Sequence, residues 1–338
     1  MKKLNLIMAL LVLFGCTKKA EVGNAKELLK DVKKKYKIVT IVKIDGIAWF
    51  ARMREGVHQF ANETGHTATL TGPTEAKAEL QIAHIEQAIK DGADAIAVVP
   101  FNVEALEPVL KKAREKGIVV IAHEASNMKN ADYIIEAFQN IEYGSHLMDH
   151  LAKLMNYKGK YIGFVGSKDS RTHMEWQLGA EIRQREKYPN ISREGDYIES
   201  KDNHSIAYTQ TVKALKKNRK INGILGSPMS TAPGAGLAIE ELGLKDKVSI
   251  VSTSLVTACS RYLESGSVDL ISFWDPSKVG YIMNLMAVMA LEKMEFKNGM
   301  NFRVDGYTNV QIDKRKKNLF YGAGWTDVTK KNMHEYTF

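Results

Sequence analysis

The most constraining feature of this sequence is a series of short apolar runs that alternate with amphipathic stretches. The runs are rich in valine and isoleucine and lie at Ile38–Ile44, Ala95–Val99, Ile118–Ala122, Tyr161–Val165, Gly223–Leu225 and Val248–Val251. Nearly continuous apolarity indicates strands that are buried on both faces, as in a parallel sheet. Strand, helix and strand at this spacing predict a doubly wound α/β fold.

The alternation occurs in two series, at about 37–138 and 140–268, which predict two similar lobes. A length of 338 residues also suits two domains. We expect the apolar run Val268–Trp274 and the helix after it to return to the first lobe. The predicted boundaries are therefore 37–138 plus about 268–306 for the first lobe, and 139–267 plus about 307–338 for the second.

The N-terminus has the pattern of an export signal. Lys2 and Lys3 precede the short apolar stretch Leu4–Phe14, which falls short of the roughly 20 residues that a membrane-spanning helix needs. The stretch ends in LFGC, which resembles the lipobox of bacterial lipoproteins and implies cleavage before Cys16 and lipidation of its thiol. A plain signal peptide with a chance cysteine is the alternative.

Export and lipidation leave a simple layout for the rest of the chain. We expect a signal peptide at 1–15, a polar tether at 16–36 and anchorage to a membrane through lipid. Cys259 is the only other cysteine, so no disulfide within the chain is expected.

Motifs for cofactors and catalysis are missing from the sequence. There is no GxGxxG after the first strand, no phosphate-binding loop and no GxSxG nucleophile elbow. We predict no metal site from the nine histidines, which include no HExxH motif. The net charge of +9 is spread along the chain, so no nucleic-acid partner is expected. The sequence therefore favours a binding protein without a cofactor over an enzyme.

Polar and aromatic residues gather where the predicted strands end. Ligands of open α/β sheets bind at the carboxyl ends of strands. Carboxylates, amides and hydroxyls suit sugar hydroxyls, and an indole face suits the apolar face of a sugar ring. The residues that we select on this ground are Lys43, Asp45, Trp49, Asn102, His123, Glu124, Trp176, Ser227, Trp274 and Asp275. They predict a cleft between the lobes for a small polyhydroxylated molecule.

Several segments together resemble one known family. They are KIDGIAWFARMREGV (43–57), DAIAVVPFNVEALEPVLKKAREKGIVVIAHEAS (94–126), NADYIIEAFQN (130–140) and FWDP (273–276). The combination is similar to the periplasmic sugar-binding proteins of ABC importers, in the branch that binds rhamnose or autoinducer-2. The resemblance implies a type I periplasmic-binding-protein fold with two Rossmann-like α/β lobes, a three-strand hinge and a ligand in the cleft. It also implies an importer permease as partner, a chemoreceptor as a further partner, and a monomer.

The resemblance adds residues to the predicted site. Autoinducer-2 binders of this family use a lysine after the first strand, which Lys43 matches, and an aspartate that Glu124 replaces here. Thr172 and His173 stand where the family has Asp-Gln, and Ser227 and Met229 fall near its backbone contacts. These departures place a rhamnose-like deoxyhexose first and autoinducer-2 second.

Each of these residues also has an ordinary structural interpretation. Phe50 lies on the apolar stripe of its helix although the family has an aromatic pair at 49–50, and Trp176 could also belong to the core. Lys43 and Asp45 could form a surface ion pair, and Asp275 before Pro276 is a good helix cap. Two other functions stay open. A repressor of similar fold would need a DNA-binding module in place of the signal peptide, and an extracellular enzyme would need a catalytic motif.

Overall fold

The computed structural model describes residues 25–338, so the predicted signal peptide and Cys16 lie outside the described residues. The short helix α1 (Ala25–Leu28) opens the described chain, and Ala25 and Leu29 are buried against the first lobe. The predicted tether is therefore wrong for this stretch, because the chain packs from Ala25 onward. Among the described residues no helix has both the length and the apolarity required to cross a membrane.

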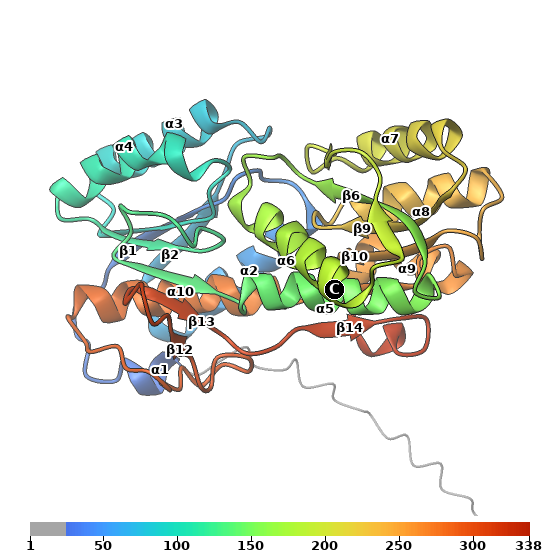
Figure 1. Cartoon of the computed structure of the whole chain (residues 1–338). Helices are drawn as coiled ribbons and strands as arrows, with labels where there is room; N and C mark the ends of the chain where they lie inside the picture. The colour runs from blue at the N-terminus through green and yellow to red at the C-terminus, as the bar shows by residue number, and fades with distance from the viewer. Residues whose placement is uncertain (1–24) are drawn as a thin grey trace, which may run out of the picture.

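The first lobe is built on a sheet of seven strands, six of them parallel. The strands are β1 (Lys37–Ile41), β2 (Thr67–Thr71), β3 (Ala95–Val98), β4 (Val119–Ala122), β5 (Tyr133–Glu136), β12 (Gln311–Ile312) and β13 (Leu319–Tyr321), in the order β12-β13-β5-β4-β3-β1-β2. Only β12 runs antiparallel to its neighbour. Helices α3 (Ala78–Lys90) and α4 (Val103–Glu115) cover one face, and α2 (Ala48–Thr64) and α10 (Pro276–Leu291) cover the other (Figure 1).

The second lobe repeats this architecture around a second sheet. Its strands are β6 (Gly159–Val165), β7 (Ile191–Arg193), β8 (Ile198–Glu199), β9 (Ile221–Gly226), β10 (Ser249–Thr253), β11 (Leu270–Phe273) and β14 (Thr326–Val328). The order is β14-β11-β10-β9-β6-β7, with β8 also paired to β6. Its helices are α5 (Asn140–Leu154), α6 (Arg171–Lys187), α7 (His204–Lys217), α8 (Thr231–Glu241) and α9 (Val256–Ser265), and the 3-10 helix η1 (Met333–Glu335) contacts α9. The fold prediction of two doubly wound α/β lobes is confirmed.

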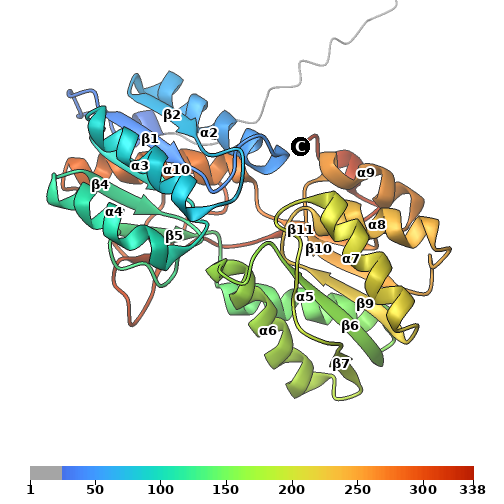
Figure 2. The same cartoon turned by 90° about the horizontal axis from the view of Figure 1, so that it is seen from above.

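The chain passes between the lobes three times, at 137–139, 274–275 and 322–325 (Figure 2). These positions correct the expected lobe boundaries. The run that contains β11 is the last parallel strand of the second sheet, paired with β10, whereas β12 and β13 belong to the first sheet. A buried strand has the same apolar pattern in either sheet, so the pattern could not assign β11 to a lobe.

Glycines allow the helices beside the interlobe region to approach closely. A Cβ atom on Gly56 of α2 would lie 1.7 Å from the carbonyl oxygen of Ser277 in α10. In the second lobe a Cβ atom on Gly144 of α5 would lie 1.9 Å from the carbonyl oxygen of Trp176 in α6. Both pairs of helices are therefore in direct backbone contact, which fixes the side chains that α2 and α6 direct toward the other lobe.

Candidate functional site

A cavity lies between the lobes, where the carboxyl ends of the two parallel sheets face each other. The first lobe and the second crossing line it with Lys43, Ile47, Trp49, Phe50, Glu124 and Trp274, and the second lobe lines it with His173, Trp176, Asp202, Ser227, Met229 and Thr253. Both lobes and the second crossing therefore contribute side chains to one concave site.

An ion pair between Lys43 and Asp202 spans the cavity. Lys43 Nζ lies 3.2 Å from Asp202 Oδ2, and their side chains are only 6% and 8% exposed. Burial alone would raise the pKa of Asp202, but Lys43 and His173 outweigh burial and hold that pKa below its ordinary value. Each lobe therefore contributes one charge to a pair that water hardly reaches.

The backbone at Asp202, which forms the ion pair with Lys43, adopts a rare conformation. Lys201 and Asp202 both have φ of +53°, in the left-handed region that residues other than glycine rarely adopt. A Cβ atom on Gly166 would lie 2.8 Å from both carboxylate oxygens of Asp202, so only glycine leaves room for this carboxylate. Glu124, on the opposite wall, also has a positive φ of +55°. Strained backbone of this kind concentrates at functional sites.

His173 is a neutral imidazole in the second wall. Its Nδ1 accepts a hydrogen bond from the backbone N–H of Gly166 at 3.1 Å. Burial, and secondarily the charge of Lys43, lower its pKa to about 3. The ring therefore adds hydrogen-bonding capacity to the cavity without adding charge.

The carboxylate of Glu124 faces the cavity beside a second buried histidine. It lies 3.8 Å from His123 Nε2, which is beyond hydrogen-bond distance. His123 donates from Nδ1 to the Ile135 carbonyl oxygen at 2.6 Å, and burial lowers the pKa of this histidine. Glu124 therefore has acceptor capacity left for a ligand.

Trp274 is at the centre of an aromatic cluster on the cavity. Its ring centroid lies 4.7 Å from that of Trp49 and 5.4 Å from that of Trp176, both edge-on. Trp176 donates from Nε1 to Asn140 Oδ1 at 2.9 Å. Within the described chain, by contrast, the buried Nε1 of Trp274 has no hydrogen-bond partner. A buried donor without a partner at the edge of a cavity is a candidate contact for a ligand.

The structure brings nine of the fourteen residues predicted from sequence into the cavity lining. These are Lys43, Trp49, Phe50, Glu124, His173, Trp176, Ser227, Met229 and Trp274. His123 and Thr172 are buried but are not among the lining residues. His123 contacts the ring of Trp274 edge-on, at a centroid distance of 6.0 Å.

Three polar residues predicted for the site are engaged elsewhere. Asp45 accepts two hydrogen bonds from Arg54, at 2.6 and 2.7 Å, and is partly exposed. Asn102 caps α4 by accepting from Ala105 N. Asp275 caps α10 by accepting from Ser277 N. Because none of the three lines the cavity, the strand-end rule selected more polar residues than the site uses.

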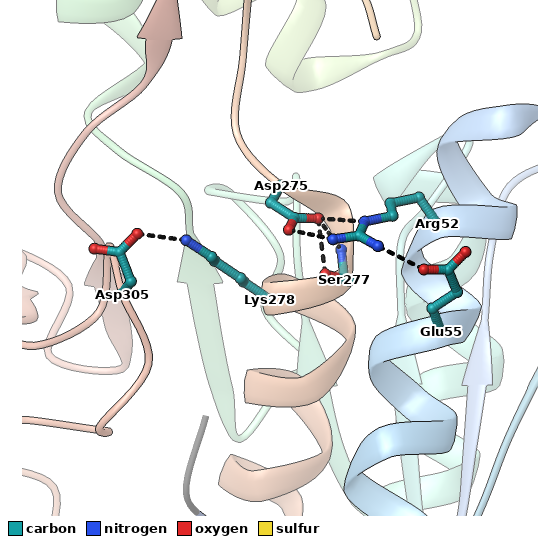
Figure 3. Close-up of polar contacts among 6 residues, drawn as sticks. All are labelled: Arg52, Glu55, Asp275, Ser277, Lys278 and Asp305. Atoms are coloured by element: carbon teal, nitrogen blue, oxygen red, sulfur yellow. Dashed lines mark hydrogen bonds and ion pairs between the residues drawn. The ribbon is translucent and has the colours of Figure 1, made fainter. Parts of the chain in front are cut away.

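Asp275 also links the second crossing to α2, as Figure 3 shows. Arg52 donates to it from Nε at 2.9 Å and from Nη2 at 2.7 Å, and bonds Glu55 through its third nitrogen. In the same region Lys278 pairs with Asp305. These contacts attach the crossing segment to the first lobe, so Trp274 moves with α2 and α10.

Three lining residues were not predicted. Thr253 ends β10, so applying the strand-end rule to every predicted strand would have found it. Ile47 directly precedes α2 and lies among residues that were selected. Asp202 follows β8, a strand of only two residues with no apolar run. No pattern in the sequence marked its place at a strand end.

Comparisons with known proteins agree with this geometry. The family model described as "Periplasmic binding protein domain" matches residues 38–295. The D-xylose-binding periplasmic protein of Escherichia coli is 24% identical over 262 residues, covering 76% of each chain. The D-ribose/D-allose-binding protein of Pseudomonas aeruginosa is 23% identical over 250 residues, covering 69% of this chain and 75% of that protein.

Solved structures show the same fold. LsrB from Clostridium saccharobutylicum in complex with AI-2 has a TM-score of 0.83 at 20% identity, covering 89% of this chain and all of that one. An ABC transporter solute binding protein from Clostridium phytofermentas with bound L-rhamnose has a TM-score of 0.81 at 19% identity, covering 90% and 98%. With a family model matched over most of its length, this chain belongs to the periplasmic binding proteins.

Proposed function

We propose that this protein is the solute-binding component of an ABC importer and that it captures a monosaccharide in the interlobe cavity. The observation that carries the proposal is the cavity lining, which draws on both lobes and holds buried polar groups with hydrogen-bonding capacity to spare. A ligand that bonds both walls favours the closed arrangement over the open one.

The lining has the two kinds of surface that a sugar ring needs. Lys43, Glu124 and Asp202 offer charged partners for hydroxyl groups, and hydrogen bonds to charged groups are the stronger ones. Trp49 and Trp274 offer apolar edges and faces for the C–H groups of the ring. A purely apolar ligand would leave the charged groups unpaired, and a highly charged ligand would meet too much apolar surface.

Within this class we propose a deoxyhexose such as rhamnose. Ile47, Phe50 and Met229 place apolar surface beside the polar groups, where a methyl group in place of a hydroxyl would be accommodated. The relatives named for xylose, ribose, allose and rhamnose support a monosaccharide as the ligand class. Autoinducer-2 is the second candidate, supported by the lysine at position 43 and by the fold shared with LsrB.

Calorimetry with a ligand panel tests the proposal. We expect saturable one-to-one binding of one monosaccharide among L-rhamnose, D-xylose, D-ribose and D-allose, with the sugar recovered unchanged. Binding of autoinducer-2 alone would select the second candidate. Formation of a product would support an enzyme, and no binding of any member would contradict the proposal. Mass spectrometry of ligand that co-purifies with the protein extends the panel to other sugars.

We also propose that the protein is exported and anchored by lipid at Cys16, as a monomer that delivers its ligand to a membrane permease and presents the closed form to a chemoreceptor. The sequence LFGC after a short apolar stretch supports the anchor. In cells fed radioactive fatty acid, the wild-type protein should carry label and Cys16→Ser should not. Equal labelling of both would contradict lipidation while leaving the sugar site unaffected.

A further inference from the structure

Two histidines and an aspartate form a compact cluster on the second lobe, away from the cavity. His146 and His150 are one turn apart on α5, and Asp327 lies on β14. His146 Nε2 lies 2.9 Å from both carboxylate oxygens of Asp327, and His150 Nε2 lies 3.2 Å from Oδ2. One ligand atom from each residue can be chosen so that all three lie within 4.8 Å of one another.

The spacing in sequence explains why the two rings meet. Residues four apart lie on the same face of a helix, so both imidazoles of α5 face the strand beside it. The prediction of no metal site assumed that the histidines include neither HExxH nor a paired-ligand spacing, and it overlooked the HxxxH pair at 146–150. The third residue is 177 positions further along the chain, and only the third crossing brings it to α5.

The ligand types select the kind of ion. Imidazole nitrogen and carboxylate oxygen together suit zinc and neighbouring transition metals, whereas calcium and magnesium prefer oxygen ligands alone. Three protein ligands with a water in the fourth position is a common tetrahedral zinc arrangement. With metal–ligand bonds of about 2.0–2.2 Å, tetrahedral nitrogen and oxygen ligands are roughly 3.3–3.6 Å apart. The two imidazoles lie 2.9 and 3.2 Å from Asp327 oxygens, and the three ligand atoms lie within 4.8 Å of one another, so binding an ion requires these side chains to shift around it.

One neighbour holds the first ring in place. Trp325, in the third crossing, packs against His146 with ring centroids 4.7 Å apart. The same indole contacts Phe138 in the first crossing, at 5.5 Å. Trp325 in the third crossing therefore contacts both the cluster and the first crossing.

We propose that His146, His150 and Asp327 bind one divalent transition-metal ion of the zinc class. The ion joins α5, which follows the first crossing, to β14, which follows the third. Metal binding therefore stabilises the second lobe at the point where both connections enter it, independently of any sugar.

Calorimetry with Zn²⁺ tests this proposal on the purified protein without a polyhistidine tag, after removal of metal with a chelator. Binding of one ion per chain is expected, together with a higher melting temperature in Zn²⁺. His150→Gln and Asp327→Asn should each weaken binding by ~10-fold or more, the scale on which changes around a metal site act. The exposed histidine His58 on α2 gives the matched control, and His58→Gln should bind Zn²⁺ like the wild type.

Folding and coordination are checked separately. Melting of each variant in chelator shows whether it folds without metal, and Co²⁺ in place of Zn²⁺ reports tetrahedral nitrogen and oxygen ligands through its visible absorption. The proposal is overturned if the wild type shows no saturable binding. Zn²⁺ binding that is unchanged in His146→Ala/His150→Ala would also overturn it, and the cluster would then be a hydrogen-bonded carboxylate and imidazole group only.

Discussion

The two walls of the interlobe cavity differ in chemistry and in how the chain builds them. The first wall (Lys43, Ile47, Trp49, Phe50, Glu124 and Trp274) is mainly apolar, and four of its six residues come from the segment 43–50. The second wall (His173, Trp176, Asp202, Ser227, Met229 and Thr253) is mainly polar. Its residues come from separate segments, each at or beyond the carboxyl end of one of four strands. A ligand with one apolar face and several hydroxyls can match both walls only when the lobes close.

Removing the carboxylate of the second wall should have the largest effect on sugar binding. Asp202→Ala leaves a ligand hydroxyl and Lys43 without their partner in a site that excludes water. We expect a loss of roughly 1.5–3 kcal/mol of binding free energy, which corresponds to ~10- to 150-fold weaker sugar binding in calorimetry.

Asp45 provides the matched control for this change. It is also an aspartate near the cleft, but its carboxylate is bonded to Arg54 and does not line the cavity. Asp45→Ala should leave sugar affinity nearly unchanged. Equal losses in the two variants would contradict the assignment of the second wall.

A smaller effect is expected when one hydrogen-bond donor is removed from the first wall. Trp274→Phe keeps an aromatic ring but deletes the Nε1–H that has no partner in residues 25–338. One neutral hydrogen bond contributes about 0.5–1.5 kcal/mol, so binding should weaken by about two- to tenfold. Trp325→Phe, outside the cavity, should bind sugar like the wild type. If Trp274→Phe bound equally well, the Nε1–H of Trp274 would not donate to the ligand.

The contrast between the walls also explains what could be predicted from the sequence. The apolar strand runs predicted both α/β lobes, because burial on two faces leaves a clear pattern. That pattern does not say which sheet a strand joins, and β11 was therefore assigned to the wrong lobe.

Site prediction succeeded where one segment carried several side chains. Lys43 and Trp49 follow an apolar strand and were selected together, and the resemblance added Phe50 beside them. Asp202 was missed because β8 is too short to be recognised and because the position depends on a left-handed turn and on space beside Gly166. Asp45 was selected for its place after the first strand. Its carboxylate is instead bonded to Arg54, a contact that depends on the position of α2 and that sequence spacing did not reveal.

The smallest expected effect concerns the neutral histidine of the second wall. The pKa of His173 is about 3 in the folded protein and about 6.5 in an unfolded chain. Its contribution to stability is therefore complete above pH 6.5 and is lost progressively as the pH falls from 6.5 toward 3. Between pH 8 and pH 6 we expect this group to lower the free energy of unfolding by about 0.8 kcal/mol.

Chemical denaturation at the two pH values measures this effect. His173→Gln can still accept a hydrogen bond from Gly166 N but does not titrate, so its stability should fall less over the same interval. The same decrease in both proteins would show that His173 is solvated in the native state, contrary to its burial in the structure.

Small-angle X-ray scattering shows whether the two walls close on one ligand. The three crossing segments are the connections about which the lobes can move, and a ligand that contacts both walls favours closure. With the sugar identified by calorimetry, we predict a smaller radius of gyration at saturating ligand than without it, and a weaker response to the same concentration in Asp202→Ala. A scattering profile of the wild type that is unchanged at saturating sugar would contradict closure around the ligand.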